Sequence, residues 1–142
     1  MKFSEDILNK AIISAYDELA WKSADVFDAI EELAAKNCAI LGGDVWVTTG
    51  LKENQNELTQ IDRATVAVGI IKGKNGQDFV FNWHTNRETN ESFSDYVLRC
   101  KADTINAIND MKTEQTVAEE FKDSIYYNLV YVDSKEFNKL GT

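Results

Sequence analysis

The sequence contains no proline, one histidine and two cysteines among its 142 residues. It also has no Gly/Ser-rich or low-complexity stretch that would separate two units, so we expect residues 1–142 to form a single domain. No run approaches the roughly 18 apolar residues that a membrane-spanning helix needs. The start, MKFSEDILNK, carries acids where a signal peptide would be apolar. We therefore expect a cytoplasmic protein with no membrane partner.

The shortage of histidine and cysteine limits the chemistry that the chain can perform. Catalysis by a Cys–His pair or a Ser–His–Asp triad would have to use His84, whose place at the end of a predicted strand is more typical of a surface or structural histidine. Cys38, Cys100 and His84 lack the spacing of zinc ligands. Adjacent acids such as Glu31 and Glu32 point apart on a helix, and no glycine-rich phosphate-binding motif is present. We therefore predict no catalytic residue, no metal, no cofactor and no enzymatic activity.

The two cysteines stand in apolar surroundings, Cys38 before a predicted strand and Cys100 within a predicted helix. This setting is typical of buried thiols in a reducing compartment. The alternative is a disulfide between the two residues.

Acidic side chains are in excess. The chain has 24 acidic and 15 basic residues and a formal net charge of −9, and the acids are spread along its length. Such a surface argues against nucleic acid as a partner, because the phosphate backbone attracts lysine and arginine. It is compatible with a basic protein partner drawn in by long-range attraction. Simple solubility is the other interpretation.

Residues 64–84 predict a β-hairpin. Val66, Val68 and Ile70 alternate in the first strand, residues 79, 81 and 83 are aromatic in the second, and Asn75-Gly76 suits the tight turn between them. We expect this hairpin to be the floor of the core, with the other segments packed upon it. The remaining patterns predict helices over residues 4–20, 23–37 and 92–111, strands over 38–49 and 125–133, and a short closing helix over 134–140.

This order of elements predicts an α+β fold. We expect a single domain with two N-terminal helices, a central antiparallel or mixed sheet of about four strands, and one long helix packed on the sheet. Ser92 or Ser94 is expected to cap that long helix.

The Gly42-Gly43-Asp44 unit interrupts the strand pattern over residues 38–49. It fits two short strand pieces, or one strand with a bulge. Asp44 then either forms a turn by bonding its own backbone or is an exposed anion at a binding surface.

Three segments together resemble small immunity proteins of bacterial polymorphic toxin systems. They are AILGGDVWVTTG (39–50), the hairpin end Asn82-Trp83-His84, and the capped helix start SFSDYV (92–97). The resemblance covers about residues 38–110. It implies an acidic, compact, cytoplasmic and non-catalytic protein that binds a cognate toxin domain and blocks it.

We therefore predict an immunity protein that occludes a basic toxin domain, such as a nuclease. The alternative is a small-ligand-binding or regulatory α+β domain with a pocket between the third helix and the sheet. The toxin's identity and the oligomeric state stay open at this point. The candidate partner-binding residues are exposed acids and one aromatic anchor, each of which simple solvation also explains: Asp44, Trp46, Glu53, Glu57, Asp62, Glu88 and Glu91.

Overall fold

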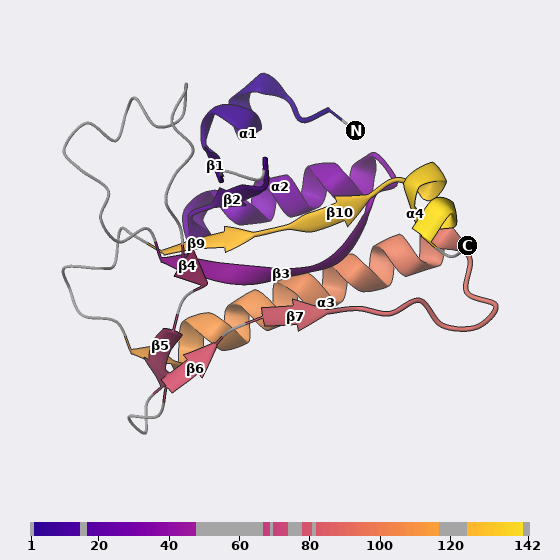
Figure 1. Cartoon of the computed structure of the whole chain (residues 1–142). Coiled ribbons are helices and arrows are strands. Elements are labelled where there is room, and N and C mark those ends of the chain that lie inside the picture. Colours follow the sequence, from indigo (N-terminus) through magenta and orange to yellow (C-terminus); the bar gives the residue numbers. More distant parts are fainter. Residues whose placement is uncertain are drawn as a thin grey trace.

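A computed structural model of the chain describes residues 2–14, 17–47, 67–68, 70–73, 78–80, 82–116 and 125–140 (Figure 1). The helices in these residues are α1 (Glu5–Asn9), α2 (Ser23–Ala35), α3 (Phe93–Glu114) and α4 (Ser134–Leu140). The strands are β1 (Ile12–Ile13), β2 (Leu19–Trp21), β3 (Ala39–Val47), β4 (Ala67–Val68), β5 (Ile70–Gly73), β6 (Asp78–Val80), β7 (Asn82–His84), β8 (Gln115–Thr116), β9 (Ile125–Asn128) and β10 (Val130–Val132).

Strand β3 is the centre of the main sheet. Along one edge it pairs with β9 and then with β10, and along the other edge it pairs with β4 and then with β7. Strands β2 and β1 extend the sheet beyond β9. All of these pairings are antiparallel, and seven described strands belong to this sheet. The predicted α+β class and antiparallel sheet are confirmed, whereas the numbers of strands and helices differ from the prediction.

Strands β4 and β7 are two halves of one edge strand. Trp46 pairs with Val68 and Asp44 pairs with Asn82, so the register along β3 passes from one half to the other. Between the halves, β5 and β6 pair as an antiparallel hairpin that joins β8 in a separate three-stranded sheet. Within the described residues, the hairpin predicted over 64–84 is therefore confirmed only where β5 pairs with β6, since its outer parts, β4 and β7, pair with β3. The prediction that it is the floor of the core is wrong, because β3 holds the centre.

Strand β3 is continuous and carries a bulge. Gly42 pairs with Val130, but Ile40 pairs with the next residue, Tyr131, so Leu41 is the extra residue. Of the two interpretations of this stretch, the single bulged strand is confirmed over residues 39–47. The turn interpretation of Asp44 is wrong, because Asp44 lies inside the strand and pairs with β7.

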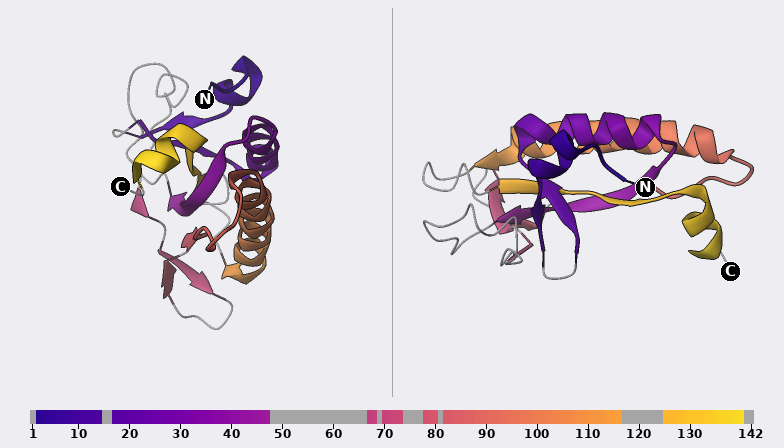
Figure 2. Two further views of the ribbon diagram at one scale, coloured as in Figure 1. Left: turned by 90° about the vertical axis from the view of Figure 1, so that its right-hand side faces the viewer. Right: turned by 90° about the horizontal axis from the view of Figure 1, so that it is seen from above.

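Helices α2 and α3 lie side by side on one face of the sheet (Figure 2). Helix α3 begins at Phe93, and of the two predicted caps Ser92 is confirmed, because its Oγ accepts a hydrogen bond from the Asp95 N–H across 3.1 Å. The predicted packing of the long helix on the sheet is confirmed by a stripe along α3, in which Phe93 is half-buried and the following members are buried: Tyr96, Val97, Cys100, Thr104, Ile108 and Met111. Helix α2 contributes a matching stripe of Val26, Ala29, Ile30 and Leu33.

The opposite face of the sheet carries a smaller buried cluster. Trp46, Tyr126, Ile12 and Ala20 form it, with exposures of 0–8%. Because side chains alternate along a strand, Asp44 and Gly42 lie on the same face as Trp46, whereas Val45 packs in the core beneath the helices. Across the middle of this second face, the described part of the chain places no helix (Figure 2).

The N-terminal segment differs from its prediction. The helix expected over residues 4–20 ends at Asn9, and a β1–β2 hairpin follows, with Asp17 at a positive φ of 63°. Pairing of β2 with β9 buries Ala20 and Trp21 completely, which a surface helix would not do. The strand predicted over residues 125–133 divides into β9 and β10 at Leu129, and the closing helix is confirmed as α4.

Candidate partner-binding site

The glycine pair in β3 allows two very close approaches. A Cβ on Gly42 would lie 2.2 Å from the backbone oxygen of Trp83. A Cβ on Gly43 would lie 1.9 Å from the backbone oxygen of Asn128 and 2.5 Å from Cη2 of Trp83. Any side chain here would therefore push β7 and β9 away from β3.

A hollow of about 350 Å³ opens over these glycines. Its lining residues come from β3, β7 and β10 and are Leu41, Gly42, Gly43, Asp44, Asn82, Trp83, His84 and Val130. Gly42 pairs with His84 on one side and with Val130 on the other, and Asp44 pairs with Asn82. Directly paired residues share a face, so these side chains surround the bare Gly42 on the face away from α2 and α3.

Asp44 is the acid of this hollow. Its side chain is half-buried, and burial raises the pKa of its carboxyl above the ordinary value. Within the described residues no hydrogen bond or ion pair involves this carboxylate. On the other side of β3, Asn128 lies next to Asp44. This follows from the register, because Val45 pairs with Tyr127 and Gly42 pairs with Val130. Asn128 is fully buried; its Nδ2 donates to the Leu19 carbonyl oxygen across 2.9 Å, and its Oδ1 has no hydrogen-bond partner among the described residues.

The rim of the hollow is mixed in character. Asn82 and His84 are exposed polar residues, and Val130 leaves 39% of its surface exposed. The hollow thus offers a half-buried carboxylate on β3, polar side chains on β7 and an apolar side chain on β10. Such a mixture suits an amphipathic side chain with an aliphatic stem and a charged end.

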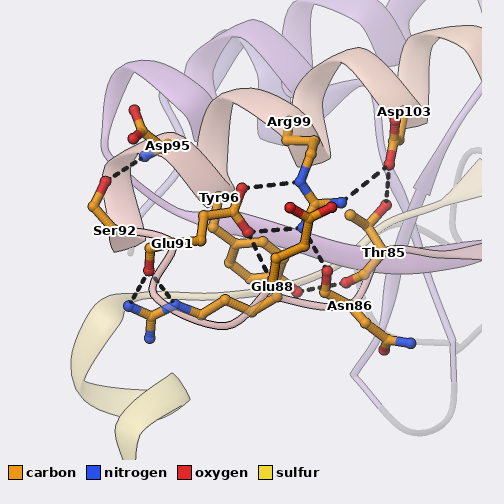
Figure 3. A network of polar contacts seen from close by, with 10 residues as sticks. Thr85, Asn86, Glu88, Glu91, Ser92, Asp95, Tyr96, Arg99 and Asp103 are labelled. Carbon is orange, nitrogen blue, oxygen red and sulfur yellow. Dashed lines mark hydrogen bonds and ion pairs between the residues drawn. The ribbon is translucent and has the colours of Figure 1, made fainter.

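Glu91 lies outside the hollow, in a network of polar contacts that precedes and includes the start of α3 (Figure 3). Its carboxylate accepts hydrogen bonds from Arg99 Nε at 2.9 Å and Nη2 at 2.8 Å, and also from the Glu88 N–H at 3.0 Å. These bonds lower the pKa of Glu91 to about 2. Arg87 in turn donates to the Glu91 carbonyl oxygen. Glu91 therefore already has a cationic partner within the chain, whereas Glu88 is exposed.

The structure does not place the remaining predicted site residues in the hollow. Trp46 is only 4% exposed, in the cluster with Tyr126, so the chain itself covers most of its surface. Glu53, Glu57 and Asp62 lie outside the described residues. The structure thus places Asp44 alone of the predicted set in the hollow.

Three further sequence predictions concern cysteine, metal and membrane. Cys38 and Cys100 are both buried and free, so the thiol interpretation is confirmed over the disulfide. Across the described ranges, His, Cys, Asp and Glu nowhere gather in a group of three or more that could hold a metal. None of the described helices is long and apolar enough to cross a membrane.

Comparison with known proteins then decides the family. A family model described as Immunity protein 40 matches residues 8–131. The chain belongs to the Immunity protein 40 family. This confirms the predicted immunity protein of a polymorphic toxin system, and the match extends well beyond residues 38–110. No curated protein and no solved structure matches this Immunity protein 40 family member.

Sequence reasoning missed part of the hollow of this Immunity protein 40 family member. Asn82, His84 and Val130 were not predicted to bind a partner. The alternation in Asn82-Trp83-His84 does place Asn82 and His84 on one face of a strand. Nothing local indicates that Val130 joins them, because its pairing partner Gly42 lies 88 residues earlier in the sequence.

Proposed function

We propose that this Immunity protein 40 family member binds a toxin domain and blocks it by covering its active-site cleft. Membership of the family carries the proposal. The protein acts by occlusion, without chemistry of its own. Acidic side chains of its surface face a basic cleft, such as that of a nuclease, and the protein acts in the cytoplasm.

The charge of the chain supports an electrostatic encounter. A net charge of −9 on 142 residues creates a field that attracts a basic domain and raises its association rate. The candidate acids Glu53, Glu57 and Asp62 are the residues that we expect to contribute most to this steering. Buried contacts would then set the lifetime of the complex.

The first test is protection. The toxin domain encoded beside this chain is expressed with and without it, and growth is measured. Growth arrest that this protein relieves supports the proposal, and equal arrest in both cultures contradicts it. Direct binding of the two purified proteins is then measured by surface plasmon resonance.

The second test addresses charge. The association rate should fall steeply as salt rises, because the Debye length shortens to about 8 Å at physiological ionic strength. Replacing Glu53, Glu57 and Asp62 by Gln, Gln and Asn should slow association and flatten that dependence. The matched control replaces three exposed acids elsewhere, Glu5→Gln, Glu18→Gln and Asp28→Asn. Equal effects from both triple variants would show that only total charge matters.

A further inference from the structure

We propose that the hollow between β3, β7 and β10 receives one basic side chain of the toxin domain, an arginine or a lysine, with Asp44 as its ionic partner. This inference rests on the proposed function. It adds which face of the protein meets the toxin and which chemical group the toxin inserts.

The geometry provides a socket for one side chain. The floor at Gly42 has no side chain, and the strands beside it cannot close over it because their backbones are fixed by pairing. Asp44 lines the hollow and is half-buried, while Val130 and His84 pair with the glycine from either side. A volume of about 350 Å³ accommodates a long side chain that enters from solvent.

The charge pattern selects a cation. Some acids of the described chain have basic partners within it: Glu91 pairs with Arg99, Glu31 with Lys101 and Glu32 with Lys36. No such partner reaches Asp44 within the described residues, although burial disfavours its charged form. An incoming guanidinium or ammonium group would replace the water that this carboxylate has lost. The aliphatic stem of the same side chain would cover the exposed part of Val130.

In the absence of a partner, the charged Asp44 carboxylate should also lower the stability of the folded protein. A carboxylate that is partly removed from water destabilises the folded state when it is charged. Replacement by asparagine keeps the shape and removes the charge. Asp44→Asn should therefore leave the free protein at least as stable as wild type while weakening the complex. A residue with a purely structural role would show the opposite, a loss of stability.

The experiment measures binding of the adjacent-gene toxin domain to Asp44→Asn at 0.15 M salt. We expect the dissociation constant to rise at least tenfold, mainly through faster dissociation, because the partner's charge is left buried and unpaired. Asp28→Asn is the matched control, since it removes the same charge from an exposed site on α2, which covers the other face of the sheet. This control should change the dissociation constant less than twofold.

A second variant blocks the socket from within. Asn82 is exposed and directly opposite Asp44, so Asn82→Lys places an ammonium group beside the carboxylate. It should weaken binding as strongly as Asp44→Asn while keeping the fold, as judged by circular dichroism. Alanine variants of the toxin's surface arginines and lysines then identify the occupant. One of these toxin variants, combined with Asp44→Asn, should weaken binding by less than the sum of the two separate effects.

The outcomes separate the two proposals. If the wild-type protein neither binds nor protects, the proposed function fails. If it binds but Asp44→Asn and Asn82→Lys bind equally well, the function stands and the socket is overturned. If both variants change only self-association in analytical ultracentrifugation, the hollow holds a second copy of this chain, and the socket for a toxin side chain is again overturned.

Discussion

The indole Nε1 of Trp83 donates a hydrogen bond to Oγ1 of Thr104, with 3.1 Å between the two atoms. The bond joins edge strand β7 to the middle of α3, and Thr104 is fully buried. Trp83 thus crosses Gly43 beneath the hollow and ties the edge strand to the helix layer. The position of Asn82 and His84 on the other face depends on this tie, because both flank Trp83 in the chain.

We expect Thr104→Val to destabilise the protein by about 1–3 kcal/mol. The substitution keeps the shape of the side chain but leaves the Trp83 N–H unpaired in a buried place. Urea denaturation measures the effect. A double-mutant cycle with Trp83→Phe supplies the control, since Thr104→Val should have a smaller effect when the indole N–H is already gone. Equal effects in both backgrounds would show that the bond contributes nothing.

Gly43→Ala should destabilise the protein by more than about 2 kcal/mol. The new Cβ would meet the Asn128 backbone oxygen at 1.9 Å, and a paired backbone yields far less than a flexible side chain. Chemical denaturation, with circular dichroism to confirm the fold, tests this. A second variant, Trp83→Leu with Gly43→Ala, should recover little stability, because the backbone clash persists. Near-wild-type stability of Gly43→Ala would contradict the close approach of β3 and β9.

The Glu91–Arg99 ion pair should make the stability of the fold depend on pH in the acidic range. The folded pKa of Glu91 is lowered to about 2 from an ordinary 4.5. The contribution of the charged Glu91 to the stability of the fold is therefore complete above about pH 4.5 and is lost as the pH falls toward 2. The stability difference between wild type and Glu91→Gln should shrink over that window, as urea midpoints at several pH values will show.

The matched control for that window is Glu88→Gln, which removes a charge from an exposed neighbour. Its effect should be small and nearly constant over the same range. A difference for Glu91→Gln that stays constant down to pH 2 would mean that the ion pair does not stabilise the fold.

Both thiols should be unreactive in the folded protein. Burial raises the pKa of Cys38 and raises that of Cys100 to about 11, so neither supplies much thiolate at neutral pH. A thiol reagent should modify both only after unfolding, and without any reductant. Protection that persists in denaturant until a reductant is added would contradict the free state of the two residues.

The sequence by itself determined the helices α2, α3 and α4 and the pairing of β5 with β6. These elements depend on local signals, such as the stripe from Tyr96 to Met111, the Ser92 cap and the Asn75-Gly76 sequence between the two strand patterns. The resemblance to immunity proteins also depended on short motifs within the chain, and the family match confirmed it.

Only the tertiary structure decided the N-terminal hairpin, the interrupted edge strand and the hollow. Apolar residues between Leu8 and Ala20 fit a helix or two strands equally well, and the burial of Ala20 and Trp21 against β9 selects the strands. Asp44, Asn82 and Val130 meet because three segments far apart in the sequence adopt one register. Local periodicity carries no information about such register, since it is set by which side chains the assembled layers bury.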